Sequence, residues 1–341
     1  MQDHGRLDAL GRLEDLPQEY RDELRRCNLM PFWPSLRSVL PPGVPSHNTQ
    51  LTHWSYAGLR PLLMQAGELT PIEKAERRVL VLANPGHRLE NMKVSPAMYL
   101  GMQLLLPGEK APTHRHTPNA VRMVVEGKGA CTTVNGEKCS MERGDLIHTP
   151  TGMWHEHAHE GDVPVIWLDV LDLPLIYYAE VSYVVEGSSQ EVQGGHGERA
   201  YARGGVVPSP GFERSDRPYP LVRYPWTDVR YALLSLAADR SQDEPVQVTY
   251  VNPETGHDPE NNLGFHALML RPGQELRLPA RSPACAFARL RLPSHRRRCR
   301  RRDRRHTVRA EGGRHLLRSG LHGGPVAEPG PEPAQFHLPS R

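Results

Sequence analysis

Residues 107–127 have the sequence PGEKAPTHRHTPNAVRMVVEG, and residues 144–159 have the sequence GDLIHTPTGMWHEHAH. In both stretches, runs of strand length end at Pro, Gly or Asn, the residues that favour turns. Similar runs precede and follow them, from residue 78 to residue 171. Short strands separated by turns every ten or so residues predict a β-sandwich or a barrel.

Each of these two stretches also carries a pair of histidines separated by one residue. Side chains two apart on a strand point to the same face, so His114 and His116 are expected side by side, as are His155 and His157. The turn residues between the two stretches can return the chain, so that His155 lies opposite the first pair. We therefore predict that His114, His116 and His155 hold one metal ion.

Three neutral imidazoles leave about three open positions on an octahedral ion, enough for a chelating substrate and dioxygen. An isolated His-x-His motif is more often structural, but two such pairs on predicted strands favour a metal site. Histidines alone do not fix the metal, and a three-histidine zinc site for hydrolysis stays open. His87, His148 and His159 fall outside this pattern and are expected at the surface.

The second half of the chain repeats the pattern of the first. TYVNPETG followed by LGFHALMLRPGQEL has the same order of turn, apolar strand and Pro-Gly turn as VLANPG followed by YLGMQLLLPGEK. We interpret this as a duplicated barrel. In the second copy Pro279 and Arg281 stand where His114 and His116 stand in the first, so the second barrel is expected to bind no metal.

From about residue 287 the repeat breaks off and Arg, Pro, Gly and His dominate. Residues 288–341 contain 14 Arg and no Lys against four acidic residues, a charge of +10; because the whole chain carries +3, residues 1–287 carry −7. Three interpretations are open: a tail that binds nucleic acid or an anionic surface, a tail without a role, and a reading-frame shift that replaces the second barrel's last strands. The abrupt change in mid-repeat favours the third, and the tail is expected to be disordered.

The predicted fold is mainly β, with N-terminal helices and two barrels, the second of them incomplete. Helices are expected over residues 7–30 and 54–66. The predicted parts are an N-terminal helical region (1–75), the catalytic barrel (76–185), a linker with a loop (186–217), the start of the second barrel (218–287) and the tail (288–341).

The composition limits the compartment and the partners. No apolar run is long enough for a transmembrane helix, and the acidic N-terminus does not resemble a signal peptide. The five cysteines are scattered and include no CxxC pair, which favours a reducing cytoplasm over a disulfide framework. We expect a cytoplasmic protein that binds neither membranes nor nucleic acid.

The spacing of glycines, proline and histidines resembles the two cupin motifs. The matching positions are Gly108, His114, His116 and Gly127 in the first motif, and Gly144, Pro150, Gly152 and His155 in the second. Two positions depart from the pattern: Ala120 or Val121 replaces the usual Glu, and His159 replaces the usual Asn. With that Glu missing, HRHTPNAVRMVVEG resembles the gentisate 1,2-dioxygenase group of bicupins, which includes salicylate and 1-hydroxy-2-naphthoate 1,2-dioxygenases. Further similar stretches extend the resemblance over about residues 10–285.

This resemblance implies Fe(II) on the three histidines and assembly as a homotetramer or a dimer, if the second barrel folds. The implied substrates are dioxygen and an aromatic ring with adjacent carboxylate and hydroxyl groups. An extradiol-type cleavage between the carbons bearing those groups would turn gentisate into maleylpyruvate. Salicylate and 1-hydroxy-2-naphthoate are rival substrates, and pocket residues such as Tyr99 would decide among them. Two competing hypotheses are a metal- or sugar-binding cupin without catalysis and an inactive truncated protein.

The remaining site residues follow from strand position and from the resemblance. Arg122 is expected to point into the barrel, where its guanidinium can bind a carboxylate through two hydrogen bonds. The resemblance implies a similar anion-binding role for Arg78. For His157 it implies the role of a proton acceptor or an oxygen-orienting group. Gln103 and Asp169 are expected to line or support the pocket. For each arginine, the competing interpretation is an exposed position without a role.

Overall fold

The structure, a computed structural model, describes most of the chain. The described residues are 11–43, 46–193, 196–209, 219–241 and 245–271, together with five short strands between residues 275 and 338. The chain forms two compact units, Met1–Asn48 and Thr49–Arg341. Each unit is described by itself.

The first unit is helical. Its elements are η2 (Leu13–Asp15), α1 (Gln18–Arg26), η3 (Trp33–Ser35) and α2 (Leu36–Val39). Salt bridges from Arg25 to Asp22 and from Arg26 to Glu23 join side chains three residues apart on α1. One helix was predicted over residues 7–30. The structure has the short η2 and then α1 in this range, and residues 7–10 lie outside the described residues.

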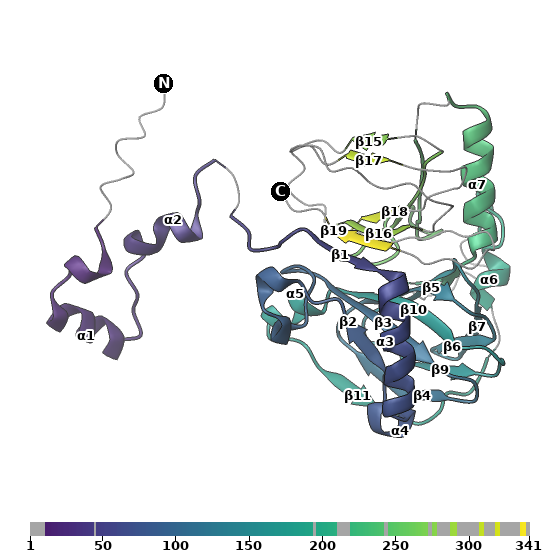
Figure 1. The fold of residues 1–341 in the computed structure, drawn as a ribbon, viewed down its shortest axis with the longest axis horizontal. Helices are drawn as coiled ribbons and strands as arrows, with labels where there is room; N and C mark the ends of the chain where they lie inside the picture. The colour runs from purple at the N-terminus through teal and green to yellow at the C-terminus, as the bar shows by residue number, and fades with distance from the viewer. Residues whose placement is uncertain are drawn as a thin grey trace. The chain divides into compact units, whose positions relative to one another are not determined.

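The second unit begins with a strand and a helix that lead into the barrel (Figure 1). They are β1 (Thr52–Ser55) and α3 (Tyr56–Leu69), which α4 (Ile72–Ala75) follows. The predicted helix from residue 54 thus starts two residues later, because Trp54 belongs to β1. Tyr56 and Leu63 of α3 are buried against the barrel.

Two antiparallel sheets form the barrel. One has six strands in the order β12-β8-β5-β10-β3-β2, and the other has five in the order β11-β4-β9-β6-β7. The six-stranded sheet consists of β12 (Arg223–Tyr224), β8 (Leu146–Thr149), β5 (Ala120–Glu126), β10 (Val165–Leu171), β3 (Tyr99–Leu105) and β2 (Val79–Val81). The five-stranded sheet consists of β11 (Val184–Glu186), β4 (Lys110–His116), β9 (His155–His159), β6 (Ala130–Val134) and β7 (Glu137–Met141). Short helices connect these strands: η4 (Pro85–His87), η5 (Leu89–Asn91), α5 (Leu173–Tyr178) and α6 (His196–Ala200).

Alternation along the strands of the six-stranded sheet separates two apolar cores. Side chains that face the other sheet fill the barrel interior, among them Leu105, Val124, Ile147, Trp167, Val134 and Met141. Side chains of the opposite parity pack under α3, among them Leu100, Met102, Leu104, Met123 and Leu168. Because β3, β5 and β10 are buried on both faces, their sequences are nearly continuous apolar runs.

The second half of the chain packs against the barrel through a third core. Val121 and Leu146 of the barrel contact Trp226 and Leu233 of α7 (Trp226–Ala238) and residues of the hairpin that follows. That hairpin pairs β13 (Val246–Thr249) with β14 (His266–Met269). The short strands beyond it are β15 (Glu275–Arg277), β16 (Phe287–Arg291), β17 (Thr307–Arg309), β18 (Arg318–Gly320) and β19 (Gln335–Leu338).

The mainly-β fold with N-terminal helices agrees with the sequence prediction. Most of the predicted tail, residues 288–341, lies outside the described residues, apart from parts of four strands, one of which pairs with β1. Its disorder and its origin in a reading-frame shift stay predictions. Within the described ranges, no helix has the length and apolarity needed to cross a bilayer.

Candidate metal centre

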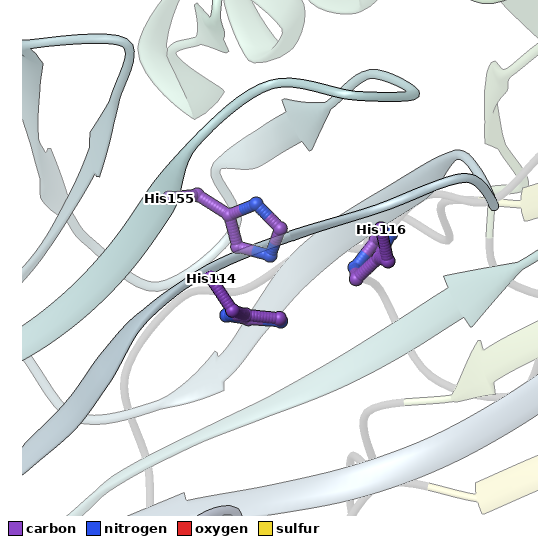
Figure 2. Close-up of side chains that lie close together, drawn as sticks. All are labelled: His114, His116 and His155. Atoms are coloured by element: carbon purple, nitrogen blue, oxygen red, sulfur yellow. The ribbon is translucent and has the colours of Figure 1, made fainter. Parts of the chain in front are cut away.

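The three predicted ligands lie on two neighbouring strands of the five-stranded sheet. β4 and β9 run antiparallel, and His114 on β4 stands directly opposite His155 on β9. Figure 2 shows the two rings close together, with that of His116 beside them. The ring centres are 4.1 Å apart for His114 and His155, 4.8 Å for His116 and His155, and 5.2 Å for His114 and His116. One ligand nitrogen from each ring lies within 4.8 Å of the others, so a single ion can contact all three.

The environment keeps these imidazoles neutral. Burial, helped by nearby Arg77, lowers the pKa of His114 to about 2, and burial together with Arg122 lowers that of His116 to about 4. Burial also lowers the pKa of His155 well below its ordinary value. Each ring therefore offers an unprotonated nitrogen at neutral pH, which a metal ligand requires.

Backbone carbonyls fix which nitrogen is free. Nδ1 of His116 lies 2.8 Å from the carbonyl oxygen of Pro118, and Nδ1 of His155 lies 2.9 Å from that of Met153. Because a carbonyl only accepts, both Nδ1 atoms carry the proton and both Nε2 atoms keep a lone pair. Nε2 of His155 is buried and has no hydrogen-bond partner in the described part of the chain. An unpartnered buried lone pair aimed at two other imidazoles fits a metal ion.

Arg122 and Asp169 form a buried ion pair in the same barrel. They are direct neighbours on β5 and β10, and Nε of Arg122 lies 3.3 Å from Oδ1 of Asp169. Arg122 also donates from Nη1 to the hydroxyl of Thr149 at 2.6 Å, and Trp167 donates to Asp169 at 3.1 Å. Burial raises the pKa of Asp169 to about 6, although the charge of Arg122 opposes that shift. These contacts hold the guanidinium in place, and its charge lowers the pKa values of His116 and His155.

Gln103 lies on β3 directly opposite Trp167, on the interior face of the six-stranded sheet. It is buried, and its Nε2 donor has no hydrogen-bond partner among the residues described. An unpaired buried amide is costly unless something else binds it. Tyr99 and Gly101 share this face of β3, and the hydroxyl of Tyr99 would lie 2.7 Å from a Cβ added at Gly101. Gln103, Tyr99 and Gly101 therefore face the barrel interior.

His157 lies beyond His155 on the same face of β9, as predicted. Its ring centre is 6.1 Å from that of His155 and 5.2 Å from that of Trp167. Burial and the charge of Arg122 lower its pKa well below the ordinary value. His157 is therefore a neutral group beside the cluster of His114, His116 and His155.

The structure does not bring Arg78 to the histidines. Its guanidinium binds both carboxylate oxygens of Glu109, at 2.6 and 2.9 Å, and the carbonyl oxygen of Thr70. The preceding residue, Arg77, points the other way: it contacts Nδ1 of His114 and donates to the carbonyl oxygen of Pro112 at 2.6 Å. The sequence pattern missed Arg77 because it did not fix which face each residue before β2 occupies.

Two histidines predicted at the surface are buried. His159 is 2% exposed: it shares the parity of His155 on β9, its Nε2 lies 2.5 Å from the carbonyl oxygen of Val163, and its Nδ1 accepts from the backbone of Gly161. His148 is 1% exposed and lies on the outer face of β8, where it contacts Glu260 at 3.4 Å. The prediction of exposure was wrong for both. Their nitrogens are engaged with carbonyl, backbone amide or carboxylate groups away from the three ligands.

Comparisons with known proteins agree with this geometry. Residues 101–171 match the cupin domain family. The crystal structure of salicylate 1,2-dioxygenase from Pseudaminobacter salicylatoxidans superposes with a TM-score of 0.72 at 28% identity, covering 95% of this chain and 91% of that one. A structure of the same enzyme with gentisate adducts gives a TM-score of 0.70 at 27% identity, covering 95% and 89%. The bicupin fold expected from the resemblance is thereby supported.

Curated relatives include one with a much higher sequence identity than these solved structures. A gentisate 1,2-dioxygenase from Ralstonia sp. is 72% identical over 278 residues, which are 82% of this chain and 78% of that protein. A 5-aminosalicylate 1,2-dioxygenase from Comamonas sp. is 32% identical over 257 residues, covering 74% and 68%. The chain therefore belongs to the gentisate 1,2-dioxygenase family of ring-cleaving cupin oxidoreductases.

Proposed function

We propose that this chain is an Fe(II)-dependent gentisate 1,2-dioxygenase that opens the ring between the carbons bearing carboxylate and hydroxyl, with maleylpyruvate as product. His114, His116 and His155 would hold the iron, the last two through their Nε2 atoms. When bound, the ion supplies a centre at which the aromatic hydroxy acid and dioxygen meet and exchange electrons. The observation that carries the proposal is the convergence of three neutral imidazoles beside a buried arginine in one barrel.

The other residues then act on the organic substrate. Arg122 attracts the carboxylate, and its own contacts with Asp169 and Thr149 hold its guanidinium in place before the substrate arrives. We assign the second anion-binding role to Arg77, because Arg78 is occupied by Glu109. The unpaired amide of Gln103 can donate to a substrate oxygen.

His157 is proposed to accept a hydrogen bond from the ring hydroxyl. Its neutral state supports this role, since a protonated imidazole has no lone pair to offer. It therefore orients the hydroxyl and receives its proton while the ring opens. Burial in the apolar barrel interior excludes competing water.

Gentisate is favoured over its rivals by the degree of similarity. The relative named for gentisate is 72% identical, whereas the solved salicylate enzyme is 28% identical. Salicylate and 1-hydroxy-2-naphthoate remain rival substrates of the same site. A relative named for the second of these, from Nocardioides sp., is 34% identical over 233 residues.

Anaerobic reconstitution with Fe(II), followed by oxygen uptake with each of the three acids, tests the proposal. Uptake is expected to be fastest with gentisate and to consume one dioxygen per ring. A His155→Ala variant should bind little iron and show no uptake, whereas His87→Ala, which changes a half-buried histidine outside the cluster, should behave as wild type. A folded, iron-loaded wild-type protein without uptake would rule out the enzymatic role, and full activity in the His155 variant would rule out the ligand assignment.

We further propose a homotetramer or a dimer located in the cytoplasm. The family implies the assembly, and the scattered cysteines of the sequence support the compartment. The mass of the native particle in solution tests the first of these proposals.

A further inference from the structure

His157 has a partner in the neighbouring strand that the reaction outlined above does not use. Thr132 on β6 stands directly opposite His157 on β9, so both side chains occupy the same interior face of the sheet. The hydroxyl oxygen of Thr132 lies 2.9 Å from Nδ1 of His157 and 3.3 Å from the sulfur of Met141 on β7. Thr132 and Met141 are fully buried and His157 is 1% exposed, so water does not compete for these contacts.

The proton count of this group limits its arrangements to two. Thr132 has one hydroxyl proton, the sulfur of Met141 can only accept, and a neutral imidazole has one N–H. If Thr132 donates to Met141, its oxygen must accept from His157, and the ring carries its proton on Nδ1. If Thr132 instead donates to His157, the proton lies on Nε2 and the sulfur has no donor from Thr132.

The surrounding charges favour the first arrangement. The positive charges of Arg122 and Arg77 both reach the ring of His157 and lower its pKa. With the proton on Nδ1, the lone pair of Nε2 is free to face these positive charges, whereas an Nε2–H group would point its positive end at them. Nε2 of His157 also has no hydrogen-bond partner among the described residues, so nothing there stabilises a proton on it.

We propose that Thr132, with its hydroxyl directed by Met141, is a positioning residue that fixes His157 in the Nδ1–H tautomer. The free lone pair of Nε2 then faces the pocket as a hydrogen-bond acceptor for the hydroxyl of the aromatic substrate. The benefit to the reaction rests on the role proposed above for His157. The assignment of the tautomer is independent of that role.

Nitrogen-15 NMR of the full chain, labelled at histidine and loaded with diamagnetic Zn²⁺, tests the tautomer directly. Protonated and unprotonated ring nitrogens have well-separated shifts, and the spectrum of His157→Gln identifies the signals of residue 157. We expect Nδ1–H in the wild type and in Thr132→Ser, and a smaller Nδ1–H population in Thr132→Val and Met141→Leu. Thr133→Val and Met102→Leu are matched controls, because Thr133 is the next residue on β6 and Met102 belongs to the core under α3.

A wild-type signal of the Nε2–H form, or an unchanged Nδ1–H signal in Thr132→Val, would overturn the proposal. Kinetics of the iron-loaded chain test the benefit separately. Thr132→Val should lower kcat by about tenfold to a hundredfold with little change in KM, and Thr132→Ser should restore it. A variant with an altered tautomer and an unchanged kcat would refute the role of His157 in the reaction, while leaving its tautomer assigned to Thr132.

Discussion

Two adjacent arginines, one position apart in an extended segment, have different partners. Arg77 and Arg78 precede β2, and neighbouring residues of an extended chain point to opposite sides. Arg77 turns toward His114, whereas Arg78 turns to Glu109. Burial lowers the pKa of Arg77 to about 10, a value at which its guanidinium still carries its charge at neutral pH. The two residues therefore have separable consequences for binding and for stability.

Substitution of each arginine by glutamine should separate the two effects. Arg77→Gln removes a charged donor from the pocket and is expected to raise KM for gentisate by roughly tenfold to a hundredfold, the worth of a hydrogen bond to a charged group. Arg78→Gln leaves the carboxylate of Glu109 without its ion-pair partner and should lower the free energy of unfolding by about 1–2 kcal/mol. Steady-state kinetics and urea denaturation measure the two quantities. The reverse pattern would show that Arg78 is the anion-binding residue.

At this scale, the sequence predicts the residues that act as pairs. Two His-x-His spacings on strands suffice to place His114, His116 and His155 together, because strand geometry is regular. The sequence could not predict which of Arg77 and Arg78 faces the histidines, since a shift of one residue along the strand exchanges the two faces. The burial of His148 was also missed, because it depends on Glu260, a residue more than one hundred positions later.

The turn between β5 and β6 contains two glycines with positive φ, Gly127 and Gly129, and Gly127 has the less room for a Cβ. Gly127 has φ of +88°, and a Cβ there would lie 2.2 Å from the carbonyl oxygen of Pro164. Gly152, in the turn before β9, also has positive φ, +73°, but a Cβ there would meet no atom within 4 Å in the described structure. Both turns need a residue with positive φ, but only the turn at Gly127 lacks room for a Cβ atom.

Alanine at these two positions should have unequal effects. Gly152→Ala is expected to cost only the unfavourable backbone conformation, about 1 kcal/mol. Gly127→Ala adds a clash with backbone that cannot move freely, and its total cost should reach roughly 2–4 kcal/mol. Urea denaturation of both variants gives the comparison. Equal losses would mean that the β5–β6 turn can shift to make room.

Elements were predicted best where the sequence alternates or is continuously apolar. The strands of the barrel follow from such runs between turn residues. The helix beginning near residue 54 was predicted two residues early, because the apolar Trp54 fits a helical period as well as a strand. The second barrel is harder to predict, since its remaining strands would come from sequence that no longer alternates.

In the whole molecule, a buried contact connects the metal-binding barrel with the segment before β14. His148 of β8 meets Glu260 at 3.4 Å, and both side chains are almost fully buried. Nearby, Asp172 accepts hydrogen bonds from Asn119 and Asn262. Burial raises the pKa of Glu260 to about 7, and His148 opposes this shift. The two halves thus meet at a carboxyl group that titrates near neutrality.

This contact should make stability depend on pH. Because the folded-state pKa of Glu260 lies above its ordinary value of 4.5, the folded protein binds the proton more tightly than the unfolded chain. The resulting stabilisation is present below about pH 4.5 and is lost as the pH rises toward 7. Glu260→Gln should therefore raise Tm at pH 8 by a few degrees and change it little at pH 4.5.

Thermal unfolding at several pH values measures this difference. Glu160→Gln serves as a control, because Glu160 is exposed and Lys138 lowers its pKa. Its carboxylate therefore stays charged over the pH range in which Glu260 titrates. An identical fall of Tm with pH in the wild type and in Glu260→Gln would assign the dependence to another group.

The edge strand β11 has a consequence for the exchange of the metal. β4, which carries His114 and His116, is paired along its outer side with the three-residue strand β11 and with the residues that flank it, and the side chains of Val184 and Glu186 are exposed. Short exposed edges open locally far more often than the whole protein unfolds. Opening of β11 frees the outer backbone of the ligand-bearing strand while the barrel stays folded. The lifetime of the bound ion would then follow the fraying of this short edge segment and not the stability of the molecule.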